Sequence, residues 1–181
     1  MLALEEHLEK ALAGQIEDLD ENPDIVKELR TIHGTCRQHI PILKALAEAR
    51  EEGGQGIAET VKRAASSVLG VGAAAVDFLR TEKLPKNLRD DYTAVSLASI
   101  GYVMLYTTAL ALNDEDVAQV AYRHLENHAK STMSLHNIIP VAVVRFLVQE
   151  GHAVQDAVLP EVARSIQAVW ESEEDVPQTA G

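Results

Sequence analysis

Apolar residues recur at spacings of three and four along almost the whole chain, and this helical period is the strongest constraint on the fold. In the first segment the apolar stripe consists of Leu4, Leu8, Leu12, Ile16 and Leu19. No stretch alternates in the manner of a strand with turn residues between partners, and no repeat has a constant period. Only 4% of the residues are aromatic, so Ala, Leu, Val and Ile must build the core. The pattern predicts an all-α fold of closely packed helices.

Helix-breaking residues divide this pattern into six predicted helices. They cover residues 2–19, 24–52, 57–79, 92–113, 115–148 and 160–170. The breaks fall at Asn22-Pro23, at the glycine-rich residues 53–56, at 84–87, at Asn113-Asp114 and at Gly151. Pro41 and Pro140 should bend the helices that contain them. Because the loops are short, we expect antiparallel neighbours in one helical bundle domain, residues 1–170, followed by an acidic disordered tail, residues 171–181.

Composition excludes several classes of function. A net charge of −12 and a pI near 4.9 repel phosphate backbones, so we expect no nucleic-acid partner. The single cysteine, Cys36, rules out an internal disulfide framework and fits a reducing compartment. Arg37 and His39 beside it could lower its pKa, although an inert buried thiol is the simpler interpretation. The acidic N-terminal residues do not resemble a signal peptide, and a cytoplasmic location is expected.

Residues 92–113 carry no charge and are about as long as the roughly 20 residues that span a membrane. Both flanks are acidic, however, and the segment contains several Ser, Thr and Tyr residues. We therefore predict a central helix that neighbouring helices bury on most sides, and no membrane association. This helix and the apolar run after Pro140 offer more hydrophobic surface than one small bundle needs. That surplus predicts a homo-oligomer, most simply a dimer, whose protein partners beyond itself the sequence does not identify.

Polar residues on two of the predicted helices have competing interpretations. Carboxylates are plentiful on the first helix, but they alternate with lysine in the manner of a solvated face. The members of this predicted solvated face are Glu5, Glu6, Glu9, Glu17 and Asp18. On the uncharged helix, Ser99, Tyr102 and Tyr106 form a polar stripe that could line a cavity or satisfy itself internally.

Seven histidines are the main candidates for chemistry, and none of them has a glutamate three positions before it. The Glu-x-x-His pairs of carboxylate-bridged metal sites are thus missing. His124 and His128 lie one turn apart on one helix face and could chelate a metal, with His39 as the third ligand and His33 next in order. Neutral imidazoles suit Zn, Ni, Cu or Fe. Ordinary surface histidines are the alternative interpretation.

The helix order and lengths over residues 2–150 resemble the ferritin-like bundles, in particular the small bacterial YciF-type stress-response branch. The resemblance implies Glu-x-x-His in Thr35-Cys36-Arg37-Gln38-His39-Ile40 and in Leu125-Glu126-Asn127-His128. Cys36 and Leu125 stand where glutamate belongs, and both histidines survive. Ser99 or Tyr102 occupies the place of a bridging glutamate. The resemblance therefore implies a non-enzymatic, stress-related bundle, with an extra connecting helix and a short C-terminal helix, that has lost its di-iron site and needs no cofactor.

A second resemblance implies an enzyme. Bundles of the DinB type hold one metal with a histidine on an early helix and a His-x-x-x-His pair on a late helix. His39, His124 and His128 are similar in order and separation. The aromatic residues that usually precede the first histidine in that family are replaced by Thr31-Ile32-His33-Gly34. This alternative implies a thiol-dependent transferase with one divalent transition metal, Zn, Fe or Ni.

Overall fold

The computed structural model describes residues 1–19, 22–52, 83–155 and 157–171, and within these ranges all regular secondary structure is helical. This confirms the all-α prediction. The helices are α1 (Leu2–Asp18), α2 (Pro23–Glu52), α4 (Lys83–Ala111), α5 (Glu115–Gln149) and α6 (Val158–Glu171). The helix predicted over residues 57–79 lies outside the described residues, as does the predicted tail from residue 172 onward.

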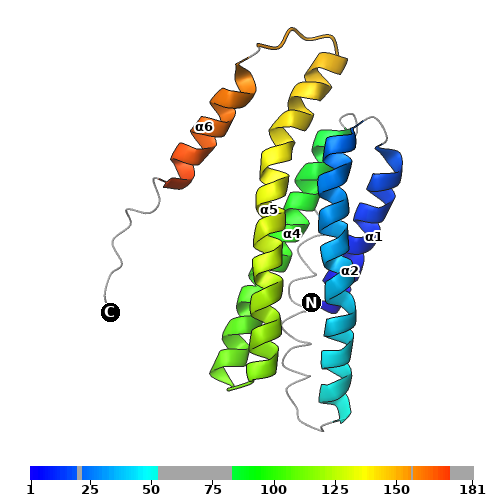
Figure 1. Cartoon of the computed structure of the whole chain (residues 1–181), viewed down its shortest axis with the longest axis vertical. Coiled ribbons are helices and arrows are strands. Elements are labelled where there is room, and N and C mark those ends of the chain that lie inside the picture. Colours follow the sequence, from blue (N-terminus) through cyan, green and yellow to red (C-terminus); the bar gives the residue numbers. More distant parts are fainter. Residues whose placement is uncertain (20–21, 53–82, 156, 172–181) are drawn as a thin grey trace.

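Helices α1, α2, α4 and α5 lie side by side, and α6 diverges from the end of α5 (Figure 1). The main contacts join α4 to α5 and α1 to α2; α2 also contacts α5, α1 contacts α4, and α6 contacts α5. The predicted apolar stripes meet in the middle. The fully buried large members of this core are Leu8, Leu12, Ile25, Leu29, Ile32, Leu88, Val95 and Leu135. Each such side chain contributes about 1.5–3 kcal/mol of transfer free energy.

Most helix ends agree with the predicted breaks, and one does not. Asn113 adopts a φ of 54° in the α4–α5 turn, and the Asp114 side chain caps α5 by accepting a hydrogen bond from Val117 N at 3.3 Å. Gly151, with a φ of 81°, follows the end of α5. The predicted break at residues 84–87 is wrong, because α4 begins at Lys83 and contains them. Pro85 sits in the first turn, where its missing N–H has no intrahelical partner to lose.

Arginine side chains connect helix ends that are distant in the sequence. Arg50 of α2 pairs with Asp114 at the α4–α5 turn. At the other end of the molecule, Arg145 of α5 donates to both carboxylate oxygens of Asp24, at 2.8 and 2.7 Å, and to Asn22 Oδ1 at 3.1 Å. These contacts hold α2 against α5 at both ends.

Helix α4 is less buried than the sequence predicts. Ile100, Val103, Met104 and Leu110 lie on one face of the helix, and their exposed fractions range from 38 to 54%. By length and composition, Leu84–Ala111 and Glu115–Gln149 are each apolar enough to cross a membrane. In the structure, both helices also contribute polar side chains to the space between the four helices, as described below.

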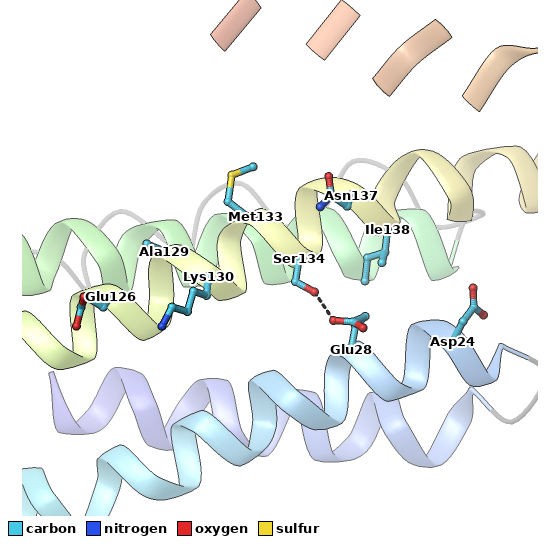
Figure 2. A pocket seen from close by; sticks show the side chains of 9 residues that line it. All are labelled: Asp24, Glu28, Glu126, Ala129, Lys130, Met133, Ser134, Asn137 and Ile138. Carbon is cyan, nitrogen blue, oxygen red and sulfur yellow. Dashed lines mark hydrogen bonds between the residues drawn. The ribbon is translucent and has the colours of Figure 1, made fainter. Parts of the chain in front are cut away.

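A surface groove separates part of α2 from α5 (Figure 2). Asp24 and Glu28 line it from α2, and Glu126, Lys130 and Ser134 are among the residues that line it from α5. Ser134 donates a hydrogen bond of 2.6 Å to Glu28 across the groove. The buried polar residues that form the candidate site lie further inside.

Candidate metal centre

The candidate site is built around Glu5, which lies in the first turn of α1 and has no solvent exposure. Glu5 stands three residues before Leu8 and seven before Leu12, so the helical period turns it toward the core with them. The prediction that places Glu5 on a solvated face is therefore wrong. Its neighbour Glu6 does face solvent and pairs with Lys44 at 2.8 Å, both side chains being about half exposed.

Three other helices each direct a donor at one oxygen of this carboxylate. His39 Nδ1 of α2 lies 2.9 Å from Glu5 Oε1, Tyr102 Oη of α4 lies 2.6 Å from it, and His128 Nε2 of α5 lies 2.7 Å from it. None of these four side chains is more than 2% exposed. The arrangement ties all four helices to a single atom.

The carboxylate of Glu5 is ionised in spite of its burial. Burial raises the pKa of Glu5, but the hydrogen bonds from His128, His39 and Tyr102 lower the pKa by more, so it falls well below the usual range. Burial, reinforced by the neighbouring Glu5, raises the pKa of Tyr102, which keeps the phenol protonated as a donor. The centre thus holds a buried negative charge, an environment that favours a cation.

His124 and Asn127 extend the network on either side. His124 Nδ1 lies 3.0 Å from Tyr102 Oη, and since that hydroxyl donates to Glu5, the imidazole N–H donates to it. Burial, followed by repulsion from His39, lowers the pKa of His124 to about 4, so this ring is neutral at pH 7. The His124 ring also stacks on His39, with ring centroids 3.6 Å apart. Asn127 Nδ2 lies 3.1 Å from His39 Nε2.

The donor atoms fit a metal ion. One carboxylate oxygen, one nitrogen of His39 and one nitrogen of His128 lie within 4.8 Å of one another. A carboxylate with two imidazoles is a ligand set that Zn²⁺ and Fe²⁺ both use, leaving positions open. Three donors crowd Glu5 Oε1, whereas Glu5 Oε2 and His128 Nδ1 are buried without a hydrogen-bond partner among the described residues. An ion beside the carboxylate would relieve both the crowding and the unpaired oxygen.

The structure brings together two of the three predicted ligands and adds one that the sequence missed. His39 and His128 converge as expected, while His124 contacts Tyr102 and lies beside the convergence point. His33, the next candidate, pairs with Glu9 at 3.0 Å. The position of Glu5 in the leucine stripe was the available signal for the missing ligand, and it was obscured by the surrounding acidic residues.

The remaining candidates stay outside the centre or are chemically inert. Ser99 donates to the carbonyl of Val95 at 3.0 Å, so Tyr102 is the member of the predicted polar stripe that enters the site. Cys36 is fully buried, as the simpler interpretation of the sequence has it. Burial and the nearby Glu5 raise its pKa, which contradicts the alternative interpretation that Arg37 and His39 lower it.

The chain matches no known family model, no curated protein and no solved structure. The centre formed by Glu5, His39 and His128, with Tyr102 and His124 beside it, therefore has to be interpreted from its own geometry.

Proposed function

We propose that this protein is a non-enzymatic, ferritin-like helical bundle protein that holds one divalent transition metal at Glu5, His39 and His128. The observation that carries the proposal is the convergence of three ligand atoms from three helices within 4.8 Å. Zn, Fe and Ni all suit this ligand set. A stress-related role rests on the resemblance alone. The ferritin-like proteins that the chain resembles hold two metal ions bridged by carboxylates, whereas the site proposed here holds a single ion.

The ferritin-like bundle with antiparallel neighbours is part of the proposal and has support from the site. His39 and His128 are the two histidines that the resemblance aligns with the Glu-x-x-His positions, and both point to the same carboxylate. Cys36, which stands in place of one glutamate, is also buried in the core. A buried polar cluster is costly unless it is satisfied, and a metal ion beside Glu5 Oε2 would satisfy that oxygen, which has no hydrogen-bond partner among the described residues.

Burial of the ligands supports a role without catalysis. Glu5 and His128 have no exposed surface and His39 has 1%, so an ion bound there is shielded from large organic substrates. A thiol transferase of the DinB type, with His39, His124 and His128 as ligands, is the second candidate, but the His124 ring stacks on His39 instead of joining the three ligand atoms. Thiol-transfer activity in the metal-loaded protein would support this second candidate over the first.

Elemental analysis of the purified, untagged protein tests the metal proposal. We expect about one equivalent of a transition metal in the parent and none after His39→Ala and His128→Ala are combined, because a single remaining carboxylate binds such an ion weakly. The matched control combines His7→Ala and His152→Ala, which remove two exposed histidines and should leave the metal content unchanged. A parent free of metal after growth and reconstitution with Zn, Fe and Ni would contradict the proposal.

We also propose a cytoplasmic homodimer in which α4 helices pair. The described surface supports a soluble protein, because α2 packs against α1 and α5 and exposes Lys27, Arg30 and Arg37. The exposed apolar side chains of α4 support pairing.

Light scattering after size-exclusion chromatography tests the dimer. We expect about twice the chain mass of 19.7 kDa, and loss of the dimer when Ile100→Glu and Leu110→Glu are combined. Met133→Glu, which changes a similarly exposed apolar residue on α5 before Pro140, should leave the dimer intact. A parent that elutes as a monomer would contradict this proposal.

A further inference from the structure

The two ring nitrogens of His39 have different partners, and this difference fixes where its proton lies. Asn127 Nδ2 can only donate, so His39 Nε2 accepts the hydrogen bond of 3.1 Å between them. A ring proton is therefore on Nδ1, from which it is donated to Glu5 Oε1 at 2.9 Å. In this state, the nitrogen that faces the centre has no lone pair to offer a metal ion.

A bound ion requires the opposite arrangement. The ion takes the lone pair of His39 Nδ1, so the ring proton has to move to Nε2, where it needs an acceptor. Asn127 carries that acceptor on the other end of the same carboxamide, because rotation of the amide by half a turn exchanges Nδ2 for Oδ1. The proton moves from one ring nitrogen to the other, and no net proton is gained or lost at His39.

We propose that Asn127 is a positioning residue of the metal centre, whose carboxamide donates to His39 Nε2 without the ion and accepts from Nε2–H when the ion is bound. This inference rests on the proposed metal function. Asn127 is suited to the exchange because it is only half-buried. Its sequence neighbour Glu126 and the residue one turn later, Lys130, both line the groove between α2 and α5 (Figure 2). Its amide therefore lies between the buried centre and residues that line a surface groove.

Neighbouring side chains give no substitute for this role. The stacked His124 ring covers one face of His39, with an interplanar angle of 11°, and its Nδ1 is engaged by Tyr102. Second-sphere partners of this kind typically change metal affinity by about 10- to 100-fold when they are removed. Asn127 should have an effect of this size even though it contacts no ion.

The test uses the full-length protein, Zn²⁺ as the probe and the variant Asn127→Leu, which keeps the size of the side chain and removes both hydrogen-bonding ends. Competition with a chromogenic chelator should show Zn²⁺ affinity lowered by about 10- to 100-fold. Asn137→Leu, the same change at an exposed groove position of α5, should leave the affinity unchanged. Nitrogen chemical shifts of the His39 ring should place the proton on Nδ1 without zinc and on Nε2 with zinc.

The outcomes separate this inference from the proposed function. If the parent binds Zn²⁺ and Asn127→Leu binds it equally well, or if the His39 proton stays on Nδ1 in the zinc-bound parent, the role of Asn127 is overturned while the metal centre stands. If the parent binds no Zn²⁺, the metal function and this inference fail together. A variant that is less stable in chelator but has normal zinc affinity would show that Asn127 is merely structural.

Discussion

Replacing Glu5 by glutamine is expected to lower the free energy of unfolding by about 3–5 kcal/mol at pH 7 in the presence of a metal chelator, the usual cost of breaking a buried charged network. The glutamine has nearly the same shape, so the loss comes from the charge. His39, Tyr102 and His128 would then donate to a neutral oxygen, and the new N–H₂ group would replace Glu5 Oε2, which has no partner among the described residues. Denaturant titration followed by helical circular dichroism measures the change.

The control for this substitution is the adjacent residue. Glu6→Gln removes the same charge from the same turn of α1, but Glu6 is about half exposed and pairs only with Lys44. Its effect should stay within about 0.5 kcal/mol. Equal stability of the two variants would show that the carboxylate of Glu5 does not hold the helices together.

Acid should act on the same network. The pKa of Glu5 is lowered in the folded protein from an ordinary value of 4.5, so its contribution to stability is complete above that pH and is lost as the pH falls below it. The pKa of a second buried carboxyl, Asp91, is shifted in the opposite direction, so its ionisation destabilises the folded protein. Its contribution gives the other large expected effect.

Asp91→Asn is expected to raise the free energy of unfolding by about 3 kcal/mol at pH 7.5, given roughly 1.4 kcal/mol for each pKa unit. Asp91 of α4 is 4% exposed. Burial, in spite of the hydrogen bond from Gln15 and with a further rise from Asp90, raises its pKa from 3.8 to about 6. The folded state therefore binds a proton that the unfolded state has lost. The parent therefore loses stability as the pH rises from 3.8 to about 6, where the loss becomes complete, and asparagine, which cannot ionise, avoids it.

The hydrogen bonding around Asp91 supports the prediction that asparagine at this position stabilises the protein. Gln15 Nε2 donates to Asp91 Oδ1 at 2.8 Å, while Gln15 Oε1 and Asp91 Oδ2 are both buried without partners among the described residues. A proton on Asp91, or the N–H₂ group of asparagine, supplies a donor for this unpaired pair of acceptors.

The measurement is a series of denaturant titrations from pH 4 to pH 8. The advantage of Asp91→Asn over the parent should be largest at pH 7 and above and should shrink toward zero near pH 4, where Asp91 is protonated in the parent. Asp90→Asn changes an exposed neighbour that pairs with Arg89 and should alter stability by less than about 0.5 kcal/mol. A variant that is destabilised at pH 7.5 would contradict the assignment.

The free energy of unfolding of the variant has to be compared with that of the parent at each pH, because His124 also changes the stability between pH 6.5 and pH 4. Its pKa falls from 6.5 to about 4 in the folded protein, so the parent loses stability as the pH drops from 6.5 to 4. Protonation of Asp91 stabilises the parent over nearly the same range. The two contributions oppose each other, and only the substitution reveals the Asp91 component.

The positions of most described helices were predictable because their apolar residues follow the helical period of three and four. The apolar period and the Asn22-Pro23 and Asn113-Asp114 breaks give α1, α2 and α5 to within a residue or two at most ends. Pro85 was misread as a break because a proline in the first turn of a helix has the same local sequence signature as a proline in a loop. The exposure of α4 depends on what packs beside it, which its own sequence does not encode.

The candidate site was predictable only in part, for a similar reason. His39 and His128 attract notice as residue types, and the one-turn spacing of His124 and His128 places both on the buried face. Glu5 is one of many acidic residues, and apart from its place in the leucine stripe, the packing of α1 against α2 and α4 distinguishes it from Glu6. Long-range convergence of this kind cannot be read from local spacing.

The separation of the three ligands along the chain has a consequence for biosynthesis. Glu5 and His39 are 34 residues apart, and Glu5 and His128 are 123 residues apart. A ribosome delivers the last ligand only after most of the polypeptide has emerged, so a nascent or truncated chain has no complete chelating set. Under the proposed function, metal acquisition would report that synthesis has passed His128 and that α5 has docked, which would be a safeguard against loading shorter fragments.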